Sequence, residues 1–245
     1  MRLFNARKPI VLSVLFFLPV TFLLFLYPSK HNYETLDIVK NDIPELRGFI
    51  TSDNEPVFYK NKISVVAFLG SEPMDDATLA LNLKELIYDK FLGFKRFQVL
   101  VLVPNSAKSQ AYALNKELNS YIPMEYWTFA FGSDQSIRDA YSNLNVSNPL
   151  QSNLSTSSIF IIDKERNQRG RLDDRTKQEV ETNFPVYSLY CYNVLEVSEL
   201  KNKMSDDIRI LFTEYRQKRK GNFDSTSRRA NDLLKWRTLT IHILE

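Results

Sequence analysis

The feature that most constrains the fold is a regular alternation, along residues 62–163, of short apolar runs with amphipathic stretches. The apolar runs are rich in β-branched and aromatic residues, which is typical of buried strands, and the amphipathic stretches carry apolar side chains at helical spacing. Strands that alternate with helices of this length predict an α/β fold with a mainly parallel sheet flanked by helices. The expected strands are residues 62–69, 97–104, 126–131 and 157–163, and the expected helices are residues 75–91, 106–120 and 136–144, the last with Ser133 or Asp134 as its N-cap.

The chain after residue 163 follows a different pattern. KERNQRGRLDDR, residues 164–175, is polar and predicts a hairpin, and residues 187–194 are expected to form an edge strand. From Ser198 to Lys220 the apolar side chains recur at three- and four-residue spacing, so a long terminal helix should pack on the sheet. Its stripe consists of Leu200, Met204, Ile208, Leu211, Phe212 and Tyr215. The predicted domain spans residues 61–220, preceded by a connector over residues 29–60 and followed by a loosely ordered tail over residues 221–245.

The N-terminal region carries an uncharged apolar run over residues 10–27. At about 1.5 Å per residue, such a run would be roughly 27 Å long as a helix, so a transmembrane helix is expected over residues 10–28. Arg2, Arg7 and Lys8 precede the run and Lys30 follows it, which predicts that residues 1–9 are cytoplasmic. The expected protein is therefore a single-pass protein of the inner membrane with a periplasmic domain. A cleaved signal peptide is the alternative, although the sequence after the run lacks a small-residue cleavage site.

The scarcity of glycine, histidine and cysteine excludes several kinds of site. The six glycines are too far apart to form a phosphate-binding loop of the dinucleotide or P-loop type. His31 and His242 lie near opposite ends of the chain and Cys191 is the single cysteine, which excludes a structural zinc site and an internal disulfide. A formal net charge of +3 gives no indication of nucleic acid as a partner. Cys191 and Trp127 are both expected to be buried.

Four features together resemble the SCO/SenC family, whose members are membrane-anchored, thioredoxin-like proteins that help to build the copper site of cytochrome oxidases. They are the N-terminal apolar run, the order of strands and helices, the segment WTFAFGSDQSIRDAYSNLNV over residues 127–146, and the strand IFIID followed by a charged turn. The resemblance covers residues 60–215. It implies a thioredoxin-like fold of the SCO type and a role in oxidase assembly.

The sequence departs from the family at the positions that bind copper. The resemblance places the first family cysteine at Glu72, followed by the matching Pro73, the second cysteine at Asp76, and the histidine at Ser155. Copper(I) prefers thiolate and imidazole ligands, so this set is not expected to hold copper, and no cofactor is predicted. The disulfide chemistry of the family is lost together with the two thiols.

Two interpretations of the carboxylates at this position stay open. Asp75 or Asp76 could cap the following helix, because a carboxylate accepts hydrogen bonds from free amides at a helix N-terminus. Alternatively, Glu72 and Asp76 could form an acid–base pair, which would need one carboxyl with a raised pKa in a cleft. The sequence favours capping, since no second cluster of acidic side chains completes a catalytic site.

The candidate docking surface is the arginine-rich turn within residues 164–175. Its four arginines, Arg166, Arg169, Arg171 and Arg175, lie on the predicted hairpin, although a solvated hairpin of mixed charge is the plainer interpretation. The basic run over residues 214–221 could contact anionic headgroups or an acidic partner, or could simply complement the helix dipole.

The predicted function is non-enzymatic: an assembly or accessory factor that acts by contact with membrane proteins. The resemblance implies that this role belongs to the biogenesis of a respiratory oxidase. A membrane-tethered enzyme using Glu72 and Asp76, and a structural subunit of a membrane complex, are the alternatives.

Overall fold

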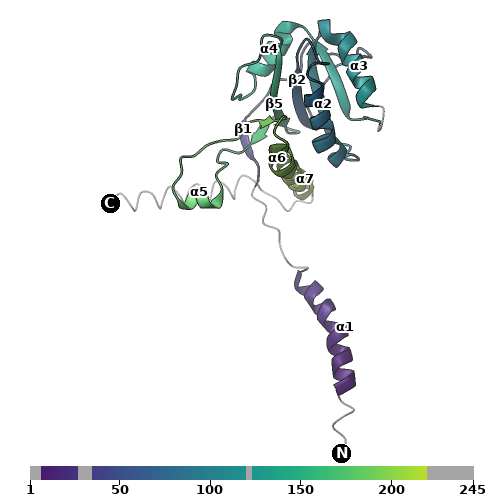
Figure 1. Cartoon of the computed structure of the whole chain (residues 1–245), viewed down its shortest axis with the longest axis vertical. Coiled ribbons are helices and arrows are strands. Elements are labelled where there is room, and N and C mark those ends of the chain that lie inside the picture. Colours follow the sequence, from purple (N-terminus) through teal and green to yellow (C-terminus); the bar gives the residue numbers. More distant parts are fainter. Residues whose placement is uncertain (1–6, 27–34, 120–122, 220–245) are drawn as a thin grey trace, which may run out of the picture. The chain divides into compact units, whose positions relative to one another are not determined.

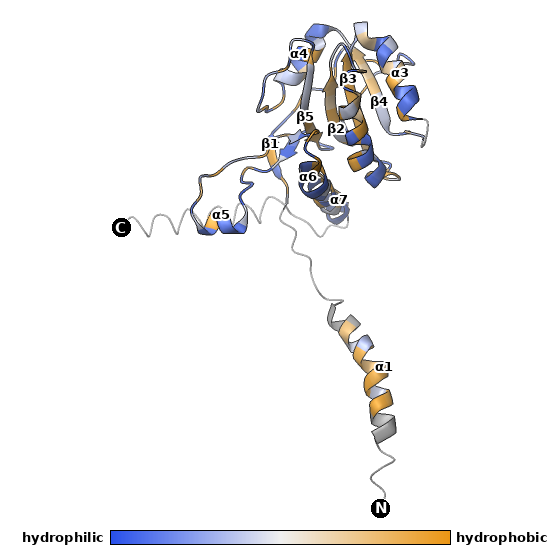
Figure 2. Ribbon diagram, in the orientation of Figure 1, coloured by the Kyte–Doolittle hydropathy of each residue, from blue (hydrophilic) through white to orange (hydrophobic). Residues whose placement is uncertain are grey.

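The computed structural model describes residues 7–26, 35–119 and 123–219 of the 245-residue chain. The chain divides into two units, residues 1–34 and residues 35–245. In the first unit, helix α1 spans Arg7–Leu26 with Pro19 inside it and is mostly hydrophobic (Figure 2). The side chains of residues 11–22 are exposed. Among the described residues, no helix combines the length and the apolar character needed to cross a membrane. Helix α1 is present where the sequence predicts a helix, and its insertion in a membrane stays a prediction.

The second unit is built around one seven-stranded sheet with the order β1-β6-β5-β2-β3-β4, in which β7 pairs with β5 (Figure 1). Only the β2–β3 and β3–β4 pairs are parallel, and the other pairs are antiparallel. The expectation of a mainly parallel sheet is therefore wrong. The strands are β1 (Asp37–Lys40), β2 (Ile63–Leu69), β3 (Phe97–Pro104), β4 (Trp127–Gly132), β5 (Ser155–Ile162), β6 (Gln168–Gly170) and β7 (Tyr192–Asn193).

The direction of β5 follows from the path of the chain after β4. Helix α4 (Asp134–Ser142) has only nine residues, and the loop over residues 143–154 then returns the chain to the end of the sheet at which β2, β3 and β4 terminate. At that edge Ser155, the first residue of β5, pairs with Leu69, the last residue of β2. Because β5 begins where β2 ends, it must run in the opposite direction. Three parallel strands are extended by β5, which is antiparallel to β2, and by β6, which is antiparallel to β5. With helices on both faces, this arrangement makes the fold thioredoxin-like.

Both faces of the sheet are buried, which explains why its central strands are continuously apolar. Val65 and Ala67 point to a core covered by α2 (Ala77–Leu83), α3 (Lys108–Leu118) and α7 (Ser205–Arg219). Val66 and Phe68 point to a second core, covered by α4 and by the segment before β2. Figure 2 shows that the covering helices contain both hydrophobic and hydrophilic residues.

The segment over residues 29–60, expected to be a connector, belongs largely to the folded unit. It contributes β1 to the sheet and buries five large side chains in the second core. These are Ile43, Leu46, Phe49, Val57 and Tyr59. The folded unit therefore begins at Thr35, well before residue 61.

The remaining elements agree with the predicted helices and refine the predicted hairpin. The helix expected over residues 75–91 is a continuous helical segment in which α2 is followed by a π-turn, η1 (Lys84–Tyr88), and a 3-10 turn, η2 (Asp89–Phe91). The 3-10 turn η3 (Asn105–Ala107) leads into α3. The predicted hairpin is formed by β5 and β6. Residues 172–188 then form an arm that contains α5 (Lys177–Glu181), and the chain returns to the sheet at Leu189, which pairs with Arg171. The strand expected over residues 187–194 shrinks to β7.

The terminal helix is confirmed as part of the core. Helix α6 (Val197–Glu199), the π-turn η4 (Leu200–Met204) and α7 are continuous, and Leu200, Met204, Ile208 and Leu211 are fully buried. The tail expected over residues 221–245 lies outside the described residues.

Truncating this stripe should destabilise the domain. Leu211→Ala is expected to lower the free energy of unfolding by on the order of 3 kcal/mol, because it removes apolar contacts and leaves a cavity. Arg219→Ala, at an exposed position of the same helix, is the control and should leave the melting temperature nearly unchanged. A thermal melt of both variants, followed by circular dichroism, gives the comparison. Equal melting temperatures would mean that the stripe faces something other than the core.

Candidate functional site

The candidate site lies where β2 ends and the loop over residues 70–76 begins. Gly70 has a φ of +65°, and a Cβ atom there would lie 2.4 Å from the carbonyl oxygen of Asn153 and 2.8 Å from the backbone nitrogen of Ser155. The next residue, Ser71, donates its N–H to the same Asn153 oxygen at 2.8 Å. The loop is thereby held directly against the start of β5. A glycine is required here because no other residue allows so close an approach of two backbones.

This packing brings together Asp76 and Ser155, two of the positions identified by the family resemblance. Ser155 is 2% exposed, and its hydroxyl lies close enough to the Asp76 carboxyl to lower the pKa of that carboxyl, against the effect of burial. Pro73 is also buried, whereas Glu72 is exposed. In the described structure the Glu72 carboxylate makes no hydrogen bond with Asp76 or Ser155. Of the three positions that replace the family's copper ligands, Asp76 and Ser155 therefore lie close together, and Glu72 does not join them.

Asp76 occupies the N-cap position of α2 but does not cap the helix with its side chain. Its carbonyl oxygen accepts the N–H of Leu79 at 2.9 Å, and no side-chain capping bond is formed. The carboxyl oxygen Oδ2 is buried and has no hydrogen-bond partner within the described structure. Of the two residues predicted as possible caps, Asp75 and Asp76, the prediction is therefore wrong for Asp76.

The surroundings of Asp76 disfavour its ionised form. Burial raises the pKa of Asp76 above its ordinary value, the Ser155 hydroxyl opposes that rise, and the negative charge of Asp75 adds to it. Around Ser155 the side chains are neutral: its hydroxyl lies 3.4 Å from Oε1 of Gln151, and its N–H donates to Oδ1 of Asn153 at 3.1 Å. The site thus offers one carboxyl, one hydroxyl and two amides, with neither a thiol nor an imidazole. Within the described residues, no group of three His, Cys, Asp or Glu side chains is placed to hold a metal ion.

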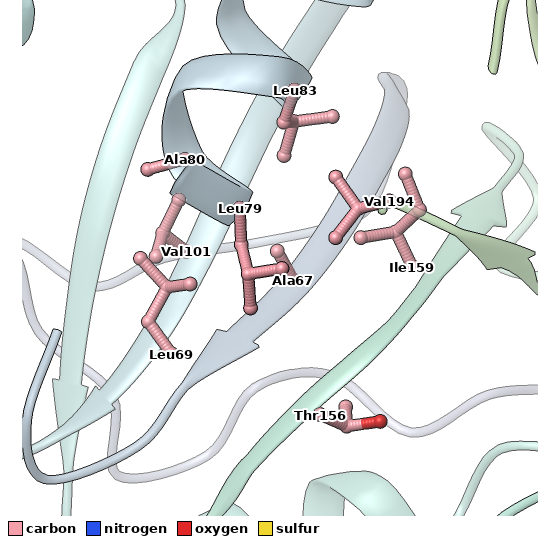
Figure 3. A pocket seen from close by; sticks show the side chains of 9 residues that line it. All are labelled: Ala67, Leu69, Leu79, Ala80, Leu83, Val101, Thr156, Ile159 and Val194. Carbon is pink, nitrogen blue, oxygen red and sulfur yellow. The ribbon is translucent and has the colours of Figure 1, made fainter. Parts of the chain in front are cut away.

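The cavity next to this site is too small for a ligand. It lies between α2 and the sheet and has a volume of about 10 Å³, enough for about one water molecule. Figure 3 shows Leu79 and Leu83 of α2 facing strand side chains, with Thr156 as the one polar lining residue. The cavity is a packing void of the first core, and any ligand of Asp76 would have to approach from the loop side.

The four arginines of the predicted docking surface lie in different environments. Arg169 is 3% exposed and donates to Asp163 at 2.9 Å, to Glu214 at 2.7 Å and to the carbonyl oxygen of Leu36 at 2.6 Å. It cannot contribute to a docking surface, and this part of the prediction is wrong. The physical reason is that Glu214 of α7 and Asp163, which directly follows β5, both pair with the buried guanidinium.

The other three arginines are more accessible. Arg171 is half-buried and pairs with Asp207 of α7 and with Asp174, both at 2.9 Å. Arg175 pairs with Asp173 on the arm at 2.7 Å. Arg166 is partly exposed in the tight turn before β6, where its φ is +67°. Docking through these three stays a prediction.

A signal for the buried ion pairs was present in the sequence. Arg169 and Arg171 are two residues apart and so share one face of a strand, while Asp207 and Glu214 are seven residues apart and so share one face of a helix. Two arginines on a strand face matched by two acids on a helix face indicate that the helix crosses that strand. The expected burial of Cys191 and Trp127 is confirmed, at 9% and 6% exposure.

No protein-family model matches the chain, and no curated protein sequence matches it. Solved structures with a similar chain trace include BsSco, a member of the Sco family of cytochrome c oxidase assembly proteins, at 12% identity and a TM-score of 0.47 over 74% of this chain and 99% of that one. A SCO1/SenC family lipoprotein from Bacillus anthracis str. Ames is 13% identical, with a TM-score of 0.44, over 71% and 96%. A peroxiredoxin-like protein from Aquifex aeolicus is 16% identical, with a TM-score of 0.38, over 66% and 86%. The assignment of the fold rests on the strand order and register described above.

Proposed function

We propose that the protein is a membrane-anchored assembly or accessory factor that acts by contact with other membrane proteins and not as an enzyme. The observation that carries the proposal is the set of side chains at the carboxyl end of β2, where Glu72, Asp76 and Ser155 stand in the places that the resemblance gives to two thiols and an imidazole. A carboxyl and a hydroxyl cannot exchange a disulfide or bind copper(I) as thiolates do. The fold is thus kept while that chemistry is absent. The link to cytochrome oxidase biogenesis rests on the sequence resemblance to the SCO/SenC family.

The proposed anchor is helix α1. The apolar sequence of α1 and the basic residues Arg2, Arg7 and Lys8 support a single span with a cytoplasmic N-terminus and a periplasmic domain. Purifying the tagged full-length chain from native membranes tests the proposal. An assembly factor should bring down membrane proteins in less than stoichiometric amounts, whereas stoichiometric retention in a mature complex would indicate a structural subunit. Copper that stays bound in stoichiometric amount after dialysis against a mild chelator would contradict the proposal.

A second candidate function, a tethered enzyme, is favoured by one observation. Asp76 combines a raised pKa with a buried oxygen that has no partner within the described structure, which is a property of some general acids. The second carboxylate that an acid–base pair requires is not in place, because Glu72 is exposed and makes no bond to Asp76.

Replacing the two carboxylates by amides separates the two functions. Asp76→Asn combined with Glu72→Gln should leave complementation of a deletion strain nearly intact, because a contact protein needs neither charge. Asn also mimics the protonated form of Asp76, whose pKa is raised on folding. At neutral pH the variant should therefore have a melting temperature no lower than that of the wild type. Any gain in melting temperature should disappear as the pH falls through the folded-state pKa of Asp76 to below its unfolded-state pKa. A folded variant that fails to complement would establish the enzyme instead.

A further inference from the structure

The end of the sheet opposite the candidate site gathers basic side chains from four separate segments. Ile63, the first residue of β2, donates its N–H to the carbonyl oxygen of Arg96 at 2.7 Å, and Asn61 donates to that of Lys164 at 3.1 Å. These bonds bring the starts of β2 and β3 together with the end of β5, and the last turns of α7 lie alongside. We refer to the resulting surface as the basic end: Lys60, Lys62, Lys95, Arg96, Lys164, Lys218 and Arg219.

Four cations of the basic end, Arg96, Lys164, Lys218 and Arg219, are close enough for Lys164 to be affected by the charges of the other three. The Nζ atoms of Lys164 and Lys218 lie 4.2 Å and 5.0 Å from the centre of the same Tyr215 ring. Burial lowers the pKa of Lys164, and the positive charges of Arg96, Arg219 and Lys218 lower it further, against a smaller opposing effect of Glu165. The fold thus holds like charges together.

Few counter-charges are available at the basic end. Among its seven cations, Lys218 is the one that forms an ion pair within the described residues, with Glu214 at 2.8 Å. Two nearby acids, Glu165 and Glu45, keep their charge while they accept hydrogen bonds, from the Tyr215 hydroxyl and from the backbone N–H groups of Tyr59 and Lys60, and the seven cations outnumber them. The surface therefore carries a net positive charge that faces solvent.

Exposed apolar side chains accompany these cations. Leu92 and Phe94, in the loop that carries Lys95 and Arg96, are 39% and 40% exposed. Phe94 is held in place by stacking on Phe212 of α7, with ring centres 4.2 Å apart. Basic side chains interleaved with rigid, exposed apolar groups favour the boundary between lipid headgroups and acyl chains, where both kinds of group find partners.

We infer that the basic end docks on an anionic phospholipid surface. The inference rests on the proposed function in one respect, namely that α1 anchors the chain in the membrane. The eight residues 27–34 between α1 and the folded unit can span at most about 28 Å, so an inserted α1 keeps the domain close to the bilayer. Such a tether raises the effective concentration of the headgroups, and an excess of unpaired cations is complementary to their phosphates. Docking would fix which face of the domain is presented to a membrane protein, and it would leave the Asp76 site at the opposite end free.

Depth quenching on the full-length chain tests this inference. The chain, reconstituted in phosphatidylcholine nanodiscs with or without phosphatidylglycerol, carries a fluorophore at Leu92→Cys or, as control, at Asp134→Cys at the far end of the sheet. The wild-type chain, whose Cys191 is buried, serves as the labelling blank. A headgroup-attached quencher should quench the probe at residue 92 in the anionic discs, much less in neutral discs or at high salt, and should leave the probe at residue 134 bright.

Charge-matched variants complete the test. Neutralising Lys62, Arg96 and Lys164 to Gln should weaken docking on the order of 100-fold, since each cation near an anionic surface contributes about fivefold. Lys116, Lys177 and Lys201 to Gln makes the same change in net charge elsewhere and should have little effect. Equal quenching at residues 92 and 134, equal effects of the two triple variants, or quenching at residue 92 that requires an added membrane protein would each overturn the inference. A chain that fails to enter nanodiscs would instead count against the proposed anchor, and the same probes on added anionic vesicles would then test the surface alone.

Discussion

Replacing Arg169 with alanine is expected to lower the melting temperature of the domain by roughly 6–20 °C. Breaking a buried ion pair by removing one partner costs about 3–5 kcal/mol, and each kcal/mol corresponds to about 2–4 °C in a domain of this size. A thermal melt of the full-length chain provides the measurement. The result would also show why a charge reversal at this position cannot probe docking, since the domain would unfold first.

The size of this effect follows from the contacts of the guanidinium. Burial alone would lower the pKa of Arg169, but Glu214 and Asp163 outweigh burial and hold the pKa above its ordinary value. Without Arg169, two carboxylates that are 1% and 2% exposed lose their shared cation, and the carbonyl oxygen of Leu36 loses its donor.

The matched control is Arg209→Ala on the same helix that supplies Glu214. Arg209 pairs with Asp206 at 2.7 Å, but both side chains are 55% exposed, and solvent screens such a pair. Its loss should change the melting temperature little. If the two arginine variants melted alike, the charge cluster would not be what fixes α7 to the sheet.

The sequence pattern located the central strands well and failed on their direction. The strand expected over residues 97–104 is found as Phe97–Pro104, and that over residues 62–69 as Ile63–Leu69. A strand buried on both faces must be apolar throughout, so its limits are visible without knowledge of its neighbours. The direction of β5 depends on the length of α4 and on the path of the loop over residues 143–154, which carries no periodic signal.

The segment before β2 and the arginine turn were misjudged because their burial depends on distant partners. Phe49 and Tyr59 lie in irregular backbone and become buried only because the second core needs a cover, which α4 alone does not provide. Arg169 is buried because α7 brings a carboxylate to it across 45 residues. The burial of Phe49 and Tyr59 has no local periodicity in the sequence, and that of Arg169 is indicated only when the arginine spacing is compared with the acid spacing of the distant terminal helix.

At the site, resemblance and geometry agree on position and differ on role. The resemblance placed Asp76 and Ser155 at one site, and the fold brings them together because Leu69 and Ser155 are in register. The role of Asp76 as a helix cap followed from local propensity, which could not show that its side chain would form no capping bond with the free amides of α2.

The close approach of the loop to the start of β5 needs a glycine at position 70, so Gly70→Ala is expected to disrupt both the fold and the site. A side chain at a positive φ costs roughly 1–2 kcal/mol, and overpacking against the backbone of residues 153–155 should add about 1–3 kcal/mol. Gly93→Ala is a matched control, because its φ is +89° but a Cβ atom there meets nothing within 4 Å. Gly93→Ala should incur the backbone strain without the collision, so the difference between the two melting temperatures isolates the contact of the loop with β5.

Displacing the loop should also let water reach Asp76. An NMR titration should then show the pKa of Asp76 moving down toward its ordinary value in Gly70→Ala but not in Gly93→Ala. Equal melting temperatures and an unchanged Asp76 pKa would mean that the loop can move without cost, and that the pairing of Asp76 with Ser155 is not held by this glycine.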